Sequence, residues 1–227
     1  NEGKNIIKFG FGQSPFSVPD IIVEELKKNA HEKSYLPIQG LDKLRNSIAK
    51  YESKKKNYNF YSDQIIVGPG TKELMFLMHL AFDGEVLLPI PSWVSYKPQS
   101  IIAKNNYHWI KTSSENNWFP KADELENIVV KNPNKKFLFF INSPNNPSGQ
   151  VLKKLKEISE VIKKYDILVL SDEIYSELVF DENYKSLFEY CSDNVIISNG
   201  LSKWCGAGGW RLGYFVIPKK KIELLKS

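Results

Sequence analysis

The chain has 227 residues, 42% of them hydrophobic and 25% charged, so it is long enough to bury a substantial core. Its net charge is +5, but the basic residues are scattered and do not interleave with aromatic residues, which argues against a nucleic-acid-binding protein. Membrane-spanning apolar runs are missing, and the three histidines are isolated, so neither a membrane protein nor a metal site is expected. Two distant cysteines are typical of a reducing compartment, and we expect a cytoplasmic protein.

The predicted elements alternate between amphipathic helices and apolar strands. Helices are expected where apolar residues recur at helical spacing, at 19–30, 41–51, 68–81, 94–103 and 155–165. Strands are expected at the apolar runs 65–67, 86–88, 107–110, 137–141, 167–170, 194–198 and 212–216. This alternation predicts a three-layer α/β/α domain whose mostly parallel sheet has about seven strands. Residues 219–227 look like the start of a helix that is not completed, and we expect the chain to be a fragment.

Polar residues and glycines follow several of the predicted strands. In an open α/β sheet, ligands bind beside the carboxyl ends of the strands. The residues placed there are Gly70, Trp93, Asn146, Asp172 and Lys203.

The stretch 198–214 carries the most specific chemistry. Lys203 follows a buried strand and precedes a glycine-dense loop that ends at Arg211. A poorly hydrated lysine amine can act as a nucleophile toward a carbonyl, and the planar fork of an arginine suits a phosphate. An ordinary surface lysine beside a structural arginine would explain the same two residues.

A glycine-rich turn and an aromatic residue also admit two interpretations. Thr71 and Lys72 follow Gly70 at a strand-to-helix turn, where free amides can bind a phosphate, although a plain helix start is the commoner meaning. The spacing does not match a Walker loop. Trp93 is either a core residue or a ring that stacks on a flat ligand.

Three polar residues from the second half admit a similar choice. Asn146 lies in a loop rich in proline and asparagine, so it serves either the turn or a ligand oxygen. Asp172 follows an apolar strand and is either a helix cap or a carboxylate that needs a cation. Tyr175 would lie one helical turn further on and face the same pocket.

In chain order, these residues fall in segments that resemble the fold type I pyridoxal 5'-phosphate enzymes, specifically the class I/II aminotransferases of the aspartate aminotransferase group. The resembling segments are 35–40 with Leu44 and Arg45, 70–72, 91–96, 142–149, 171–175 and 202–213. The resemblance implies an aminotransferase that moves an amino group from an L-amino acid to a 2-oxo acid. It also implies that residues 1–30 are the N-terminal portion of a small domain and that 31–227 form the large cofactor-binding domain. The rest of the small domain, with the arginine for the substrate α-carboxylate, would then be absent.

The same resemblance assigns roles within the cofactor site. Lys203 would form the Schiff base with the cofactor aldehyde, and Asp172 would pair with the pyridinium nitrogen. Tyr175 and Asn146 would hold the ring hydroxyl, and Trp93 would stack on the ring.

The remaining assignments concern the phosphate, the substrate and a second subunit. The phosphate would be held by Gly70, Thr71, Lys72, Ser202 and Arg211. Ser202 gains weight because Gly200 stands where many relatives carry a hydroxyl residue. Gly12, Trp93 and Asn146 would contact the substrate, and Tyr35 would reach the phosphate of a neighbouring subunit in a homodimer.

The scaffold does not decide the reaction, so two alternatives stay open. One is a carbon–sulfur β-lyase, which would release pyruvate and ammonia without a 2-oxo acid acceptor. The other is a non-catalytic module that binds pyridoxal phosphate within a regulator.

Overall fold

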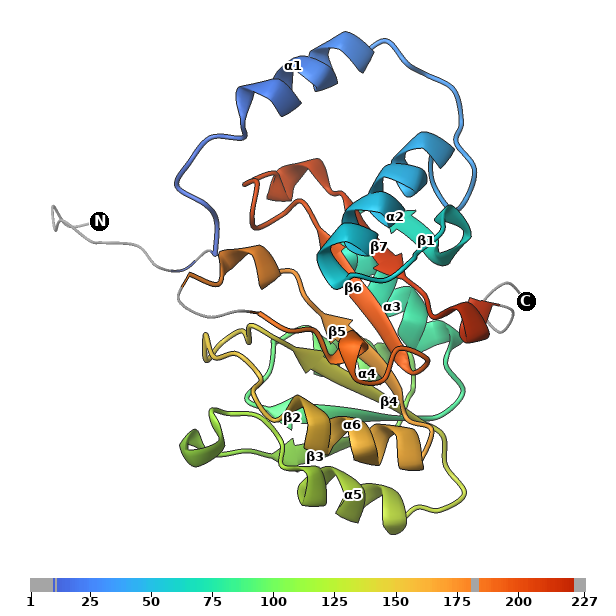
Figure 1. The fold of residues 1–227 in the computed structure, drawn as a ribbon, viewed down its shortest axis with the longest axis vertical. Coiled ribbons are helices and arrows are strands. Elements are labelled where there is room, and N and C mark those ends of the chain that lie inside the picture. The colour runs from blue at the N-terminus through green and yellow to red at the C-terminus, as the bar shows by residue number, and fades with distance from the viewer. Residues whose placement is uncertain (1–9, 11, 181–183, 223–227) are drawn as a thin grey trace, which may run out of the picture.

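The centre of the molecule is a seven-stranded sheet in the order β1-β7-β6-β5-β4-β2-β3. The computed structural model describes residues 10, 12–180 and 184–222 (Figure 1). The strands are β1 (Ile65–Gly68), β2 (Glu85–Ile90), β3 (Tyr107–Lys111), β4 (Phe137–Asn142), β5 (Leu168–Asp172), β6 (Val195–Gly200) and β7 (Gly213–Val216). Only β7 runs antiparallel to its neighbours, β1 and β6. The other pairings are parallel, which confirms the mostly parallel sheet.

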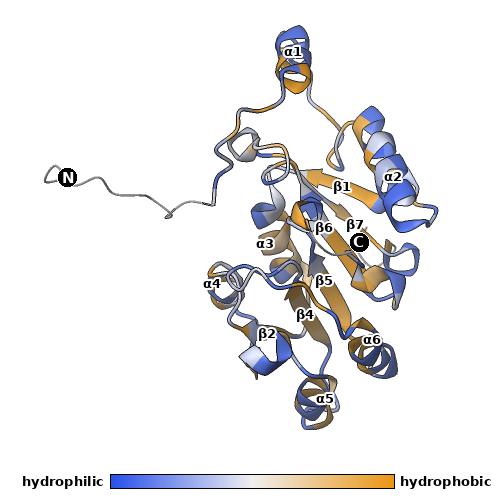
Figure 2. Ribbon diagram, turned by 60° about the vertical axis from the view of Figure 1, so that its left-hand side comes forward, coloured by the Kyte–Doolittle hydropathy of each residue, from blue (hydrophilic) through white to orange (hydrophobic). Residues whose placement is uncertain are grey.

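Helices cover both faces of this sheet and complete the predicted three layers. One face packs on α2 (Asp42–Lys56), α5 (Ala122–Val130) and α6 (Leu155–Lys164), and the other packs on α3 (Thr71–Ala81) and α4 (Tyr96–Ile102). Because side chains alternate along a strand, Phe139 joins the first core and Phe140 joins the second. Figure 2 shows the apolar strands between helices whose outward sides are hydrophilic.

The structure departs from the sequence patterns in three places. Helix α5 was not predicted, because its buried side carries few apolar residues at helical spacing, such as Leu125 and Val129. Helix α4 begins at Tyr96, two residues later than expected. The helix expected near the end of the chain begins as a short 3₁₀ turn at Lys219–Lys221, and residues 223–227 lie outside the described part.

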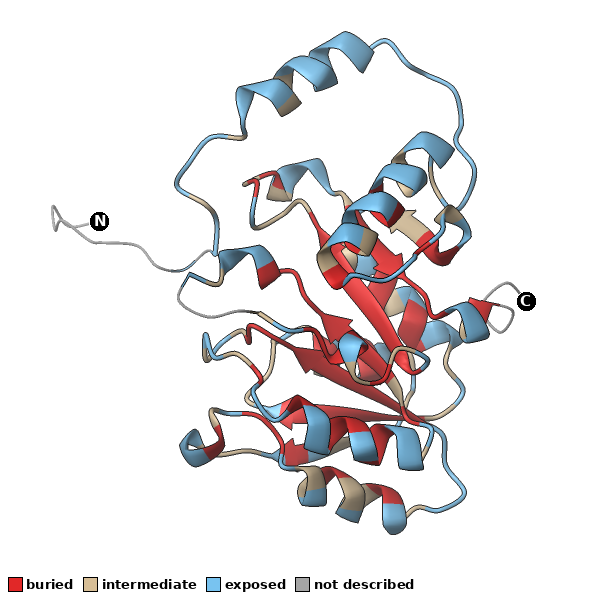
Figure 3. Ribbon diagram, viewed as in Figure 1, coloured by how far each residue is buried: buried red, intermediate tan, exposed pale blue. Residues whose placement is uncertain are grey.

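Helix α1 (Asp20–Asn29) forms where a helix was predicted but buries none of its residues. Ile21 and Leu26 are 80% and 51% exposed. Figure 3 shows α1 almost entirely exposed and apart from the three layers, whose strands are buried. This segment therefore carries an apolar side that the described chain does not cover, and its assignment to a second domain stays a prediction.

The helices that the structure describes are all too short or too polar to cross a lipid bilayer.

Candidate active site

A cavity of about 600 Å³ opens at the carboxyl ends of β4, β5 and β6. It brings together most of the residues that the sequence singled out: Gly12, Thr71, Lys72, Trp93, Asn146, Asp172, Tyr175, Ser202, Lys203 and Arg211. Gln13, Val94, Asn142 and Ile174 also line it and were not predicted. The parallel strands explain the convergence, because their carboxyl ends meet at one edge of the sheet.

Lys203 extends into this cavity from a turn after β6. Its Nζ donates a hydrogen bond to the carbonyl oxygen of Gly12 at 2.7 Å and lies 5.6 Å from the centre of the Tyr175 ring. The side chain is half-buried in the chain as described, so the poorly hydrated amine stays a prediction. The buried strand ends at Gly200, and the lysine lies beyond it in the open turn.

Gly200, three residues before this lysine, lies where the two strands leave little room for a side chain. A Cβ at that position would lie 2.6 Å from the carbonyl oxygen of Leu212, since β6 and β7 approach closely there. Any larger side chain would have to separate the two strands. Ser202, one residue before the lysine, does line the cavity.

Asp172 is the last residue of β5 and is only 4% exposed. The Tyr96 hydroxyl donates to its Oδ2 at 2.7 Å, and the Ile174 N–H donates to its Oδ1 at 3.4 Å. Among the described residues it forms no ion pair, and burial raises its pKa from 3.8 to about 6 although the Tyr96 bond opposes the shift. A cation bound in the cavity would therefore stabilise its ionised form.

Tyr175 and Asn146 meet on one side of Asp172. The Asn146 side-chain amide donates to the Tyr175 hydroxyl at 3.3 Å, and burial raises the pKa of that hydroxyl. Asn142, at the end of β4, accepts from the Asn146 N–H at 2.7 Å and donates to the Asp172 carbonyl at 2.8 Å. Asn142 thus fixes this corner of the site. Its signal in the sequence is an asparagine that closes a fully apolar strand.

The amino end of α3 and Arg211 form a second, positively polarised region. Gly70 precedes α3 with a φ of 94°, and the helix has no side-chain cap, so its first amides are available to an anion. Arg211 has a φ of 58°, which is uncommon for a residue with a side chain. Its Nη1 donates to the Gly208 carbonyl at 2.7 Å, and a Cβ on Gly70 would lie 2.2 Å from its Nη2. The positive φ favours glycine at position 70, and a side chain there would also displace the Arg211 guanidinium, although Gly70 does not line the cavity.

The two predicted aromatic residues have different surroundings. Trp93 is half-buried, lies edge-on to Tyr96 with ring centres 5.5 Å apart, and has the Lys72 Nζ 5.9 Å from its ring centre. Tyr35 is fully exposed in the loop 34–40 and does not line the cavity of its own chain. Its contribution to a neighbouring subunit stays a prediction.

Comparison with known proteins gives the family. The model of the aminotransferase class I and II family matches residues 4–227. The chain belongs to this family. The cavity at the strand ends is therefore the candidate active site.

Individual aminotransferases of the family resemble the chain over most of its length. An aspartate aminotransferase of Thermotoga maritima is 31% identical over 228 residues, which cover 96% of this chain and 60% of the relative. One from Pyrococcus abyssi is 36% identical over 233 residues, covering 97% and 59%. The crystal structure of an aspartate aminotransferase from Thermotoga maritima superimposes with a TM-score of 0.88 at 31% identity, covering 97% and 60%. The chain thus spans about 60% of the length of these aminotransferases.

Proposed function

We propose that the protein containing this chain is a pyridoxal-phosphate-dependent aminotransferase, which moves an amino group from an L-amino acid to a 2-oxo acid. The observation that carries the proposal is the buried Asp172 carboxylate, which forms no ion pair among the described residues and faces the same cavity as the Lys203 amine, whose charge lowers its pKa only in part. A ligand with a protonated ring nitrogen and an aldehyde would satisfy both groups.

The rest of the cavity fits the other groups of pyridoxal phosphate. Thr71, Lys72, Ser202 and Arg211, with the start of α3, form a seat for a dianionic phosphate. The Tyr175 hydroxyl and the Asn146 amide are polar partners for a ring oxygen. Trp93 offers an aromatic face to a planar ring.

Each residue then has a definite task. When bound, the cofactor supplies an electron-withdrawing ring that takes up the electron pair left by a departing substrate α-proton. The Asp172 carboxylate holds a proton on the ring nitrogen, since an adjacent anion favours the charged form of that nitrogen. The Lys203 Nζ would attach the cofactor through its aldehyde and, once freed by an incoming amino acid, would carry the proton from the substrate α-carbon to the cofactor carbon.

The test uses the full-length protein that carries this chain. It should absorb visible light as purified, and borohydride should fix the cofactor on a single peptide that contains Lys203. Lys203→Ala should abolish that covalent trapping while leaving reversible binding of pyridoxal phosphate. Cofactor trapped on another lysine in this variant would overturn the assignment.

A panel of L-amino acids with 2-oxoglutarate as acceptor then tests the reaction. Formation of glutamate supports the aminotransferase. Release of pyruvate and ammonia without any 2-oxo acid would instead identify a β-lyase.

The proposal extends to assembly and location. We propose a homodimer in which Tyr35 reaches the phosphate of the neighbouring subunit, and its full exposure in the single chain supports this. The uncovered apolar side of α1 supports placing residues 1–30 in a small domain, with 31–227 as the large domain. The free Cys191 and Cys205 support a cytoplasmic location.

A further inference from the structure

The segment that begins at the end of β5 has side chains on both sides of the sheet. Asp172 and Tyr175 line the cavity, whereas Glu173, Ser176 and Glu177 contact helix α2 on the other face of the sheet. The two residues that would hold the cofactor ring are therefore carried on a segment that α2 holds from behind.

The strongest of these contacts is a buried ion pair. The Lys56 Nζ lies 2.5 Å from the Glu173 Oε2, and the two side chains are 2% and 0% exposed. The other Glu173 oxygen accepts hydrogen bonds from the Ser171 hydroxyl at 3.1 Å and from the Ser186 hydroxyl. Glu173 is thus fixed from three directions.

Two further residues of α2, Lys55 and Tyr51, bind the end of the segment. The Lys55 Nζ donates to the Ser176 hydroxyl at 2.8 Å and also pairs with Glu177. The Tyr51 hydroxyl donates to the Glu177 Oε1 at 2.6 Å. Tyr175 therefore lies between two residues that α2 holds, Glu173 and Ser176.

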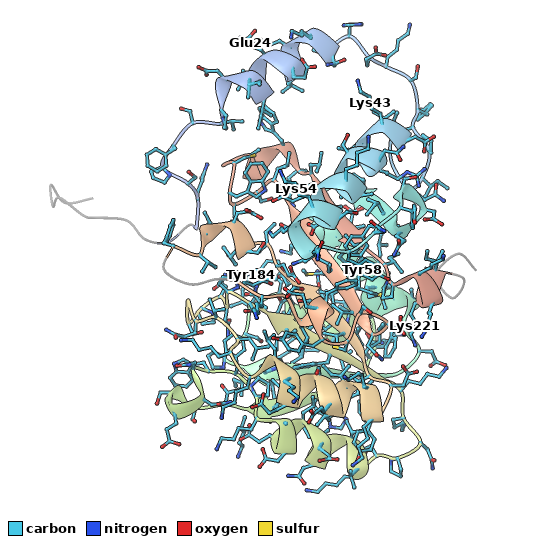
Figure 4. All side chains as sticks on the ribbon, viewed as in Figure 1. Glu24, Lys43, Lys54, Tyr58, Tyr184 and Lys221 are labelled. Carbon is cyan, nitrogen blue, oxygen red and sulfur yellow. The ribbon has the colours of Figure 1, made fainter. Side chains whose placement is uncertain are left out.

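The same helix also binds the strand beside the lysine turn. The buried Glu52, one turn before Lys56, accepts a hydrogen bond from the Tyr214 hydroxyl of β7 at 2.6 Å. The Lys56 Nζ lies 5.2 Å from the centre of the Tyr184 ring, which Figure 4 labels near the middle of the molecule. Buried charges at this end of α2 thus connect β5, β7 and the loop that contains Tyr184.

We propose that Lys56 and Glu173 are positioning residues, which set the place of the Asp172 carboxylate and the Tyr175 hydroxyl for the cofactor ring. This rests on the proposed function above. A buried ion pair contributes little net stability compared with apolar residues of similar size, but it fixes its partners in one arrangement. Among the described residues, the pair is linked to the cavity by the backbone of the segment 172–177 and by the charge of Glu173, which raises the pKa of Asp172.

The experiment compares Lys56→Met with Lys54→Met in the full-length protein. Lys54 is an exposed lysine of the same helix, labelled in Figure 4, and is the matched control. Two quantities are measured: amide hydrogen exchange over residues 172–178 in the cofactor-free protein, and the dissociation constant of pyridoxal phosphate. Lys56→Arg, which keeps the charge, tests rescue.

We expect Lys56→Met to speed exchange over 172–178 and to weaken pyridoxal phosphate binding by about tenfold, the lower end of the scale for residues that orient metal ligands from behind. Lys54→Met should change neither quantity, and Lys56→Arg should restore most of both. Unchanged exchange and unchanged affinity in Lys56→Met would overturn the proposal.

A second variant covers the case in which Lys56→Met does not fold. The double variant Lys56→Met/Glu173→Gln leaves no unpaired charge of this ion pair behind. Faster exchange confined to 172–178, with α6 unchanged, supports the positioning role, and exchange equal to that of the unaltered protein contradicts it. If the unaltered protein fails to bind pyridoxal phosphate, the proposed function falls, while the exchange measurement still decides the role of Lys56.

Discussion

Asp172 and Glu173 are adjacent carboxylates at the end of β5, yet the two faces of the sheet treat them differently. Glu173 faces the α2 side, where the Lys56 ammonium and two serine hydroxyls surround it. Asp172 faces the α4 side, where the Tyr96 hydroxyl and one backbone N–H bind it and the described residues offer no ion pair. Both are almost fully buried.

The difference separates structure from chemistry. A buried charge with a protein counter-ion is complete before any ligand arrives. A buried carboxylate whose pKa is raised to about 6 by burial, and which pairs with no cation among the described residues, is left open to a cation that enters the cavity. The comparison predicts that a change at Glu173 acts first on the stability and placement of the segment, whereas a change at Asp172 acts directly on the reaction.

The largest expected effect is on stability, at Glu173. Glu173→Ala leaves the Lys56 ammonium buried without a partner and should lower the free energy of unfolding by about 3–5 kcal/mol. Urea unfolding of the cofactor-free protein measures it. Glu177→Ala is the control, because the Lys55–Glu177 pair is partly exposed and should cost about 1 kcal/mol or less. Equal losses in the two variants would remove the distinction.

The next effect is on turnover, at Asp172. Asp172→Asn keeps the shape of the side chain but removes the charge that would hold a proton on the cofactor ring. We expect turnover of the full-length enzyme to fall by roughly 100-fold or more, as when a preorganised electrostatic partner is removed. Steady-state kinetics measures this. Undiminished turnover in a variant that still binds cofactor would contradict the role given to Asp172.

Without cofactor, the same variant should be more stable than the unaltered protein, although it lowers turnover. The pKa of Asp172 rises from 3.8 to about 6 on folding. Its stabilising contribution is therefore complete below pH 3.8 and is lost as the pH rises through 6. Since each pKa unit corresponds to about 1.4 kcal/mol, cofactor-free Asp172→Asn should be more stable than the unaltered protein by roughly 3 kcal/mol at pH 8.

Denaturant titrations of both proteins from pH 4 to pH 8 follow this difference. It should shrink toward zero at the acidic end. A constant difference across the range would mean that the carboxyl does not titrate there.

The contrast between Asp172 and Glu173 also shows which parts of the fold and the site can be predicted from the sequence. The sheet, its layers and the convergence of Asn146, Asp172 and Lys203 follow from apolar runs and from the rule that parallel strands end at one edge. These are local patterns or their direct geometric consequence. Helix α5 and the late start of α4 were not predicted, because their apolar residues follow a helical spacing only weakly.

The sequence does not predict which distant residue pairs with each buried carboxylate. Lys56 lies in a run of three lysines that is typical of a solvated helix end, yet Lys54 alone in that run is exposed. Lys56 is buried because α2 packs over Glu173, far away in the chain. Likewise, nothing near Tyr96 marks it as the partner of Asp172. Such pairings depend on tertiary packing.

The smallest expected effect concerns that partner. Tyr96→Phe removes the hydroxyl that donates to the Asp172 Oδ2, and this bond lowers the pKa of the carboxyl against the effect of burial. Because a hydrogen bond of this kind is worth about 1 kcal/mol, we expect the pKa of Asp172 to rise by roughly one unit above its present value of about 6. Carbon-13 NMR of the cofactor-free protein, labelled at aspartate carboxyls, measures the titration.

Tyr165→Phe is the matched control, since its hydroxyl donates to Glu126, away from the cavity, and should leave Asp172 unchanged. An unshifted pKa of Asp172 in Tyr96→Phe would mean that the Tyr96 hydroxyl does not lower it. The α4 side would then differ from the α2 side in lacking any side chain tuned to its carboxylate, and the place of Asp172 would depend only on the backbone that Glu173 anchors.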